Sequence, residues 1–160
     1  MNFKDIKFKK DKQNDLYWCS YTINNKSCLI VFYENKTYND ITNKRNVIYD
    51  VGFAVGKNRK QCFSFLLDES DFLENKISGN GNLSYLIFAY KAIIAFEKFI
   101  VNESKGDNVV ICVSGMDERR YKVYEYYLKK IGYKPFKFNS KKWSAHNKVY
   151  KNVKGVVYDI

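Results

Sequence analysis

The stretch "ENKISGNGNLSYLIFAYKAIIAFEKF", residues 74–99, decides how this chain folds. Two glycines, Gly79 and Gly81, stand one residue apart in it, and a long apolar run follows them directly. The length of that run, together with its few β-branched residues at the start, predicts a helix from Asn82 to about Val101. The glycine pair therefore stands immediately before the first turn of a long helix.

The predicted helix is apolar around most of its circumference. Its polar residues before the end are Ser84, Lys91, Glu97 and Lys98, of which Ser84, Lys91 and Lys98 recur every seven residues and form one narrow stripe. A helix with so narrow a polar stripe needs cover on its other sides, as when it packs on a sheet. The sequence around the helix should therefore supply strands.

Four segments before the glycine pair are short apolar runs that predict strands, and the first two are rich in aromatic and β-branched residues. Leu16–Ile23 and Ser27–Glu34 flank a turn at Asn24-Asn25-Lys26. Asn46–Val55 and Gln61–Leu67 flank Gly56-Lys57-Asn58-Arg59, which predicts a second hairpin.

The second half of the chain alternates strand and helix. Asn108–Ser114 is a continuous apolar run, typical of a central strand buried on both faces. "MDERRYKVYEYYLKKIGY", residues 116–133, predicts a helix with acidic residues at its start and Gly132 just beyond its end. "KPFKF", "KVYKNV" and "GVVYDI" then predict strands.

This order predicts a single α+β (mixed α/β) domain over residues 1–160. The strand–helix–strand unit in the middle implies that a mostly antiparallel, twisted sheet contains a parallel pair, with helices on both faces. The 46% hydrophobic and 18% aromatic content supplies enough side chains for a core.

The net charge of +11 favours encounter with phosphate-rich or acidic partners. The lysines are spread along the chain, which is also what a solvated surface looks like. Local clusters occur at Lys7, Lys9, Lys10 and Lys12, and at Lys134, Lys137, Lys141 and Lys142. Nucleic-acid binding through a basic surface is therefore one hypothesis for the function.

Cysteine and histidine are placed unfavourably for a metal site. Cys19, Cys28, Cys62 and Cys112 each stand alone inside apolar runs, and the chain has a single histidine. Buried reduced thiols, as in a cytoplasmic protein, are the better interpretation. The first residues lack the apolar core of a secretion signal, and the charges in the long apolar run argue against a membrane span.

The glycine pair has two interpretations. It turns the chain, or its backbone N–H groups hold an anion at the positive end of the helix. A dinucleotide fingerprint needs a third glycine, and the phosphate loop of nucleoside triphosphatases needs Gly-Lys-Ser/Thr. Neither is present, so both of these classes are excluded.

A further pattern resembles the GCN5-related N-acetyltransferase (GNAT) superfamily. Members carry Q/R-x-x-G-x-G/A before a long helix, and here Lys76-Ile77-Ser78-Gly79-Asn80-Gly81 matches with Lys in the first position. They also end a later helix with Tyr and Gly-aromatic, which is similar to "VYEYYLKKIGYKPF". The resemblance covers roughly residues 47–138 and is nearest to small acetyltransferase-like proteins of bacteriophages, which add an R-x-x-x-Y stretch like Arg120–Tyr124.

The resemblance implies an acyl-CoA N-acyltransferase-like fold and acetyl-CoA as cofactor. Backbone groups of residues 76–82 (Lys76, Ile77, Ser78, Gly79, Asn80, Gly81, Asn82) would bind its pyrophosphate. Its pantetheine arm would enter between two splayed parallel strands, here Gln61–Leu67 and Asn108–Ser114. A tyrosine would protonate the departing thiolate, with Tyr124 first and Tyr127 second, although core packing is an alternative role for each. Family members often place that tyrosine where this chain has Leu128.

The general base is less clearly marked. Glu69 and Asp68 follow the predicted strand before the glycine loop, and Asp50 lies inside the strand before that. A buried carboxylate could accept a proton from the amine through water, whereas an acidic residue after a strand is more often a solvated loop residue. His146 as a base, and Trp18 and Trp143 as stacking groups, compete with the simpler roles of exposed loop and packing residues.

Three hypotheses follow. The first is an acetyl-CoA-dependent N-acetyltransferase acting on an amine of a protein, peptide or aminoacyl-RNA in the cytoplasm of a bacterial host cell. The second is a catalytically silent protein of the same fold, serving as a phage virion component or an inhibitor of host defence. The third is a basic nucleic-acid-binding domain.

Overall fold

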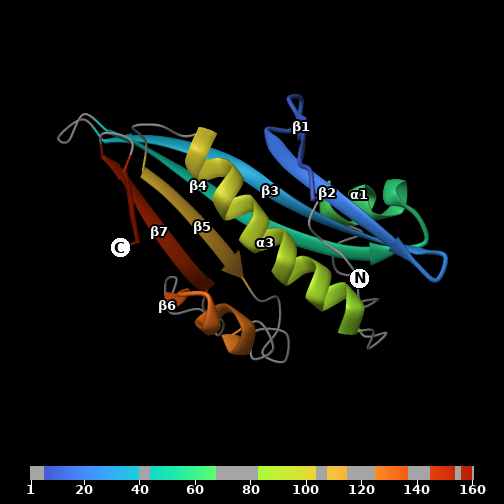
Figure 1. Ribbon diagram of the computed structural model, residues 1–160. Coiled ribbons are helices and arrows are strands. Elements are labelled where there is room, and N and C mark those ends of the chain that lie inside the picture. The colour runs from blue at the N-terminus through green and yellow to red at the C-terminus, as the bar shows by residue number, and fades with distance from the viewer. Residues whose placement is uncertain are drawn as a thin grey trace. The chain divides into compact units, whose positions relative to one another are not determined.

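The chain forms a mixed α+β fold with a mostly antiparallel sheet (Figure 1). A computed structural model describes residues 6–39, 44–67, 83–103, 108–114, 125–136, 145–153 and 156–159. The named elements are β1 (Lys9–Asp11), β2 (Leu16–Ile23), β3 (Lys26–Asn39), β4 (Lys44–Gly56), α1 (Arg59–Leu67), α3 (Leu83–Glu103), β5 (Asn108–Ser114), β6 (Lys134–Phe136), β7 (Ala145–Val153) and β8 (Val156–Asp159).

The chain divides into two compact units. The first comprises Met1–Phe32 and Gly52–Ile93, and the second comprises Tyr33–Val51 and Ile94–Ile160. In the first unit the strands are hydrogen-bonded in the order β1-β2-β3. In the second unit the order is β3-β4-β5-β7-β6, and β8 pairs with β7.

The predicted turn between the first two long strands is confirmed. β2 and β3 are joined by Asn24 and Asn25, whose φ angles are 52° and 59°. Two successive residues with positive φ are the signature of a type I′ hairpin, and asparagine tolerates this conformation better than most residues. The hydroxyl groups of Thr22 and Ser27 lie 3.1 Å apart across the hairpin.

The second predicted hairpin is wrong, because Gln61–Leu67 is helical and forms most of α1. Asn58 caps this helix: its Oδ1 accepts a hydrogen bond from Gln61 N at 2.8 Å, and its carbonyl accepts one from Cys62 N at 3.2 Å. The side chain of Gln61 reaches back and accepts a hydrogen bond from Lys57 N at 2.8 Å. This arrangement is a variant of the capping box. The chain therefore begins a helix after Gly56, where the sequence had predicted the turn of a hairpin.

Gly56 is required by this same arrangement. A Cβ atom on Gly56 would lie 2.9 Å from Gln61 Oε1 and 3.3 Å from Cys62 Sγ. The side chain that completes the cap therefore occupies the space that any larger residue at position 56 would need.

In the first unit, helices cover both faces of β2. Trp18 packs edge-on against Phe63 of α1, with ring centroids 5.2 Å apart. Tyr21 stacks on Phe88 of α3 at 5.5 Å. Trp18 and Tyr21 are three residues apart on one strand, so they point to opposite faces, and α1 and α3 lie on opposite sides of β2.

Three buried thiols accompany this packing. Cys19, Cys28 and Cys62 are buried, and the Cys62 thiol donates a hydrogen bond to the carbonyl of Ser27 at 3.3 Å. Burial raises the pKa of Cys19 and Cys28 to about 12 and that of Cys62 to about 11. The prediction of buried, reduced cysteines is confirmed, and Cys112 in the second unit is buried too.

In the second unit the predicted central strand is confirmed. β5 lies between β4 and β7, and the three strands run side by side in Figure 1. Ile111 and Cys112 are both buried and point to opposite faces of β5, so the strand is covered on both sides. A parallel pair is present as predicted, but its members are β4 and β5, because Gln61–Leu67 is not a strand.

The end of the tyrosine-rich helix also matches the prediction. Residues 125–130 are helical, and Gly132 follows with a φ of 90°. Tyr133 N donates to Leu128 O at 3.0 Å and Gly132 N donates to Lys129 O at 3.3 Å. These two bonds form a Schellman motif, which closes the helix and turns the chain toward β6.

The cap of α1 can be tested by substitution. Asn58→Ala should lower the free energy of unfolding by about 1 kcal/mol, because Gln61 N loses its acceptor. Asn58→Asp keeps the acceptor and should retain the wild-type stability. Urea denaturation of the three proteins measures this, and equal stability of Asn58→Ala and wild type would contradict the cap.

The buried thiols predict a loss of stability at alkaline pH. An unfolded thiol titrates near a pH of about 8.5, whereas the pKa values of Cys19, Cys28 and Cys62 are about 11–12 in the folded chain. Between these values the unfolded state has released protons that the folded state retains, so the free energy of unfolding should fall as pH rises through this window. Urea denaturation at pH 8 and pH 10 measures the fall, and Cys19→Ala should make it shallower. A slope unaltered by Cys19→Ala would contradict the assignment.

Candidate functional site

The parallel pair β4–β5 is the part of the second unit where the predicted cofactor arm would enter. Its register runs from Asn46 opposite Asn108 to Val51 opposite Val113 without interruption. β5 ends one residue later, at Ser114, whereas β4 continues to Gly56. The two strands are therefore paired, not splayed, over the whole of this ladder.

The ladder has two chemically different faces. Tyr49 and Ile111 are register partners on the face toward α3, and the Tyr49 ring meets Phe96 of α3 edge-on at a centroid distance of 5.1 Å. Asp50 is next to Tyr49 and so points to the other face. Its Oδ2 accepts a hydrogen bond from Asn35 Nδ2 at 2.9 Å. The carboxylate of Asp50 is thus held on the side of β4 away from α3.

Most of the predicted site residues lie outside the described part of the chain. This applies to the proposed cofactor loop, to Glu69 and Asp68, and to Tyr124, Arg120 and Trp143. Their roles stay predictions. Leu83, where α3 begins, is the first described residue after the glycine pair.

Tyr127, the second tyrosine predicted to act as an acid, is described. It is half-buried on the helical segment 125–130, and its ring meets that of Tyr126 edge-on at 5.2 Å. Tyr126 is 60% exposed and its hydroxyl accepts a hydrogen bond from Lys130 Nζ at 3.1 Å. Leu128, where family members often have the tyrosine, is 2% exposed and belongs to the core.

His146 and Trp18, two further candidates from the sequence, both lie on strands. His146 lies on β7, paired in register with Val113 on one side and Pro135 on the other, so it belongs to a strand and not to a loop. Trp18 lies on β2, where Phe63, Lys9 and Arg59 surround its ring. Trp18 therefore contributes to packing within the first unit.

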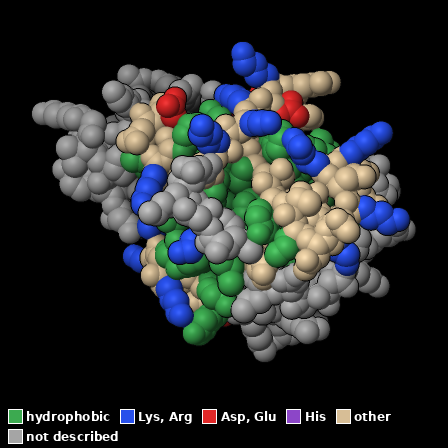
Figure 2. All heavy atoms as spheres, turned by 45° about the vertical axis from the view of Figure 1, so that its right-hand side comes forward, with side chains coloured by type: hydrophobic (Ala, Val, Ile, Leu, Met, Phe, Trp, Pro, Cys, Tyr) green, Lys and Arg blue, Asp and Glu red, His purple; other side chains and the backbone are tan. Residues whose placement is uncertain are grey.

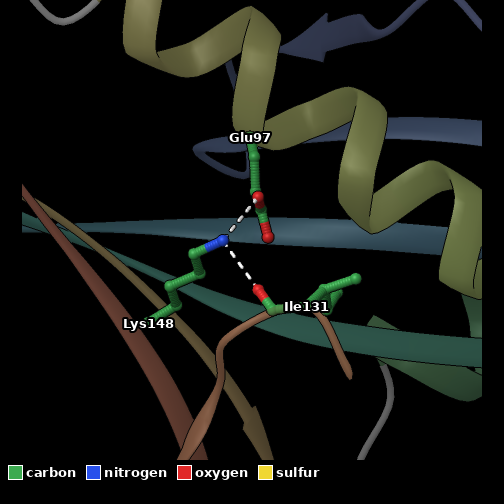
Figure 3. A network of polar contacts seen from close by, with 3 residues as sticks. All are labelled: Glu97, Ile131 and Lys148. Carbon is green, nitrogen blue, oxygen red and sulfur yellow. Dashed lines mark hydrogen bonds and ion pairs between the residues drawn. The ribbon is translucent and has the colours of Figure 1, made fainter. Parts of the chain in front are cut away.

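A polar network that the sequence did not predict joins three elements of the second unit (Figure 3). Lys148 on β7 donates hydrogen bonds to Glu97 Oε2 on α3, at 3.3 Å, and to the carbonyl of Ile131, at 2.7 Å. Ile131 follows directly after the helical segment 125–130. Lys148 therefore connects the C-terminal end of the tyrosine-bearing helix to α3 through these two hydrogen bonds.

The surroundings of this network make it sensitive to substitution. The side chains of Lys148 and Glu97 are 13% and 12% exposed, and Lys148 is the register partner of fully buried Ile111. Glu97 Oε1 is buried and accepts no hydrogen bond from the described residues. Within the described ranges, one of the two oxygens of the Glu97 carboxylate accepts a hydrogen bond, and Lys148 supplies the positive charge that balances it.

Neither a metal site nor a membrane span is found in the described ranges. No group of His, Cys, Asp and Glu there is close enough together to bind a metal ion. No described helix is both long enough and apolar enough to cross a bilayer. Comparison with protein-family models, with curated proteins and with solved structures finds no match for this chain.

The Lys148–Glu97 pair gives a prediction on stability. Lys148→Met should destabilise the protein by about 3 kcal/mol, because a buried carboxylate loses its counter-charge. Adding Glu97→Leu to Lys148→Met should recover most of that loss, because no buried charge is left. Urea denaturation of wild type, both single variants and the double variant measures the coupling. Additive effects of the two substitutions would contradict a direct pair.

Proposed function

We propose that this protein is an acetyl-CoA-dependent N-acetyltransferase with an acyl-CoA N-acyltransferase-like fold, located in the cytoplasm of a bacterial host cell. Its acceptor is an amine of a protein, peptide or aminoacyl-RNA. The observation that carries the proposal is the order of elements along the chain: a Gly-x-Gly pair leads into the long helix of the connection between two parallel strands.

The strand order of the second unit supports the proposal. The resemblance calls for a mostly antiparallel sheet that contains two splayed parallel strands, between which the cofactor arm enters. β4 and β5 are a parallel pair, although their ladder shows no splay, and the next pairs along the sheet, β5–β7 and β7–β6, are antiparallel. Beyond Val51, β4 has no register partners on β5, and an extended amide-containing arm would run along this part of β4.

The start of α3 fits an anionic cofactor. The helix is 21 residues long and has no acidic side chain in its first turn, so no side chain of that turn neutralises the positive end of the helix dipole. The backbone N–H groups of Gly79 to Asn82 precede this turn directly and would hold the pyrophosphate, with Lys76 adding a positive charge. Acetyl-CoA supplies an acetyl group activated as a thioester.

The chain's own residues would move two protons. Glu69 would accept the proton of the acceptor amine through water, which leaves the nitrogen lone pair free to attack. The hydroxyl of Tyr124, or that of Tyr127, would donate a proton to the departing thiolate. Lys148 would keep the helix that carries Tyr127 in place through its bond to the Ile131 carbonyl.

A catalytically silent binding module, as a virion component or an inhibitor of host defence, is the second candidate function. The observation that favours it is the burial of Leu128. This leucine belongs to the core and stands where family members often have the tyrosine that acts as general acid. Such a module binds acetyl-CoA without transferring the acetyl group, or binds neither cofactor nor acceptor amine.

Acetyl-CoA binding should raise the melting temperature. At a cofactor concentration of about one hundred times Kd the stabilisation is about 2.7 kcal/mol, which corresponds to a rise of roughly 5–10 °C for a chain of this size. Gly81→Glu should abolish the rise, because a carboxylate would stand where the pyrophosphate binds. Lys91→Glu, which makes a larger charge change on the exposed side of the same helix, should preserve it.

Differential scanning fluorimetry measures these shifts, with free acetate as the negative control. No rise at saturating acetyl-CoA would contradict cofactor binding. A rise that survives Gly81→Glu would contradict the assignment of the loop. Binding without release of free thiol in the presence of amine acceptors would favour the silent module over the enzyme.

A further inference from the structure

Two cations of the first unit converge on one indole ring. Lys9 Nζ on β1 lies 5.2 Å from the ring centroid of Trp18, and the Arg59 guanidinium at the start of α1 lies 5.3 Å from it. Phe63 of α1 contacts the ring edge-on. Lys9 is the cross-strand partner of Trp18, so strand pairing and helix packing both fix where these charges stand.

More positive charge stands close to Arg59 in the sequence. Lys57 and Lys60 flank Arg59 in sequence, and all three are exposed. The segment 56–67 contains no Asp or Glu. Within the described ranges, no carboxylate forms an ion pair with Lys9, Lys57, Arg59 or Lys60. We call these four side chains and Trp18 the Trp18 patch.

The fold itself gains little from this arrangement. Cations in the first turn of a helix face the positive end of the helix dipole, which is unfavourable for stability. Lys9 and Arg59 repel one another across the same ring, and their cation–π contacts offset this only in part at exposed sites. Local departures from the rules of stable folding that no described residue compensates are characteristic of binding surfaces.

We propose that the Trp18 patch binds single-stranded nucleic acid. Lys9, Lys57 and Lys60 contact backbone phosphates, and the planar Arg59 guanidinium, held over Trp18, offers a surface on which a base stacks. Unstacked bases are exposed only in single strands, which is why duplex is the poorer ligand. The patch does not include the glycine loop or the tyrosine-bearing helix, so the proposal does not depend on acetyl transfer.

The charge pattern of the surface agrees with an anionic partner of this kind. On the face drawn in Figure 2, Lys and Arg side chains outnumber those of Asp and Glu among the described residues. A general positive surface would attract any polyanion, whereas the Trp18 patch adds an aromatic ring and a guanidinium plane at one place. The experiment must therefore distinguish binding at the Trp18 patch from the general attraction of a polyanion to the net positive charge.

The experiment measures the fluorescence anisotropy of a labelled single-stranded oligothymidylate with the full chain at 50 and 200 mM salt. The Lys9→Gln/Arg59→Gln variant is compared with Lys91→Gln/Lys98→Gln, which removes the same charge from two exposed positions on α3. We expect the first variant to bind about tenfold or more weakly and the control variant to bind within about threefold of wild type. The slope of log affinity against log salt should fall by about 0.7 for each phosphate that the first variant no longer neutralises.

Trp18 also reports binding directly. In a Trp143→Phe background it is the one remaining tryptophan, and stacking of a neighbouring base should quench its emission. Four results would overturn the proposal: no binding at 50 mM salt, equal weakening by the two double variants, tighter binding of duplex than of single strand, or tighter binding of polyglutamate than of oligothymidylate. A circular dichroism melt of each variant establishes that weakened binding is not caused by unfolding.

Discussion

The parallel pairing of β4 with β5 is the constraint on which the second half of the structure depends. Two parallel neighbours cannot be joined by a hairpin, so the chain that leaves β4 at Gly56 must cross over before it enters β5 at Asn108. That crossover contains α1, the glycine pair and the long helix α3. A loop followed by a helix, ahead of a parallel strand, is also where many α/β-type proteins hold anions.

The packing of α3 follows from the same constraint. In the first unit its Phe88 stacks on Tyr21, and in the second unit its Phe96 meets Tyr49 edge-on. Phe88 and Phe96 are 2% and 0% exposed, so each contributes close to the full burial energy of an aromatic side chain, about 1.5–3 kcal/mol. Glu97, one residue further, joins α3 to Lys148 and the end of the tyrosine-bearing helix.

Sequence reasoning located the elements whose pattern is local. Three such features were predicted from their local sequence alone: the Asn24-Asn25 turn, the apolar run of α3 and the glycine after Ile131. α1 was mistaken for a strand because "QCFSFLL" is a short apolar run with two phenylalanines that follows the hairpin-like stretch Gly56-Lys57-Asn58-Arg59. The Asn58-x-x-Gln61 cap was the contrary signal, and it outweighed that composition.

The site was less accessible to prediction. The glycine pair is a local sequence pattern whose role stays a prediction, whereas the Lys148–Glu97 network joins residues far apart in the chain. Nothing in "KVYKNV" distinguishes Lys148 from a surface lysine, since its burial arises only when β7 pairs with β5 beneath α3. The Trp18 patch likewise requires that β1 and α1 meet at one side chain. Contacts of this kind form only in the tertiary fold, and no regular spacing of residues in the sequence predicts them.

The most direct test of the proposed cofactor site is hydrogen–deuterium exchange of the protein with and without acetyl-CoA. We predict slower amide exchange in peptides that cover residues 76–86 and the end of β4 at residues 52–56, because these backbone groups would bind the cofactor. Exchange in β1 and β2, residues 9–23, should be unaltered. Unchanged exchange over residues 76–86 at saturating acetyl-CoA would contradict the central claim that the glycine pair holds the cofactor.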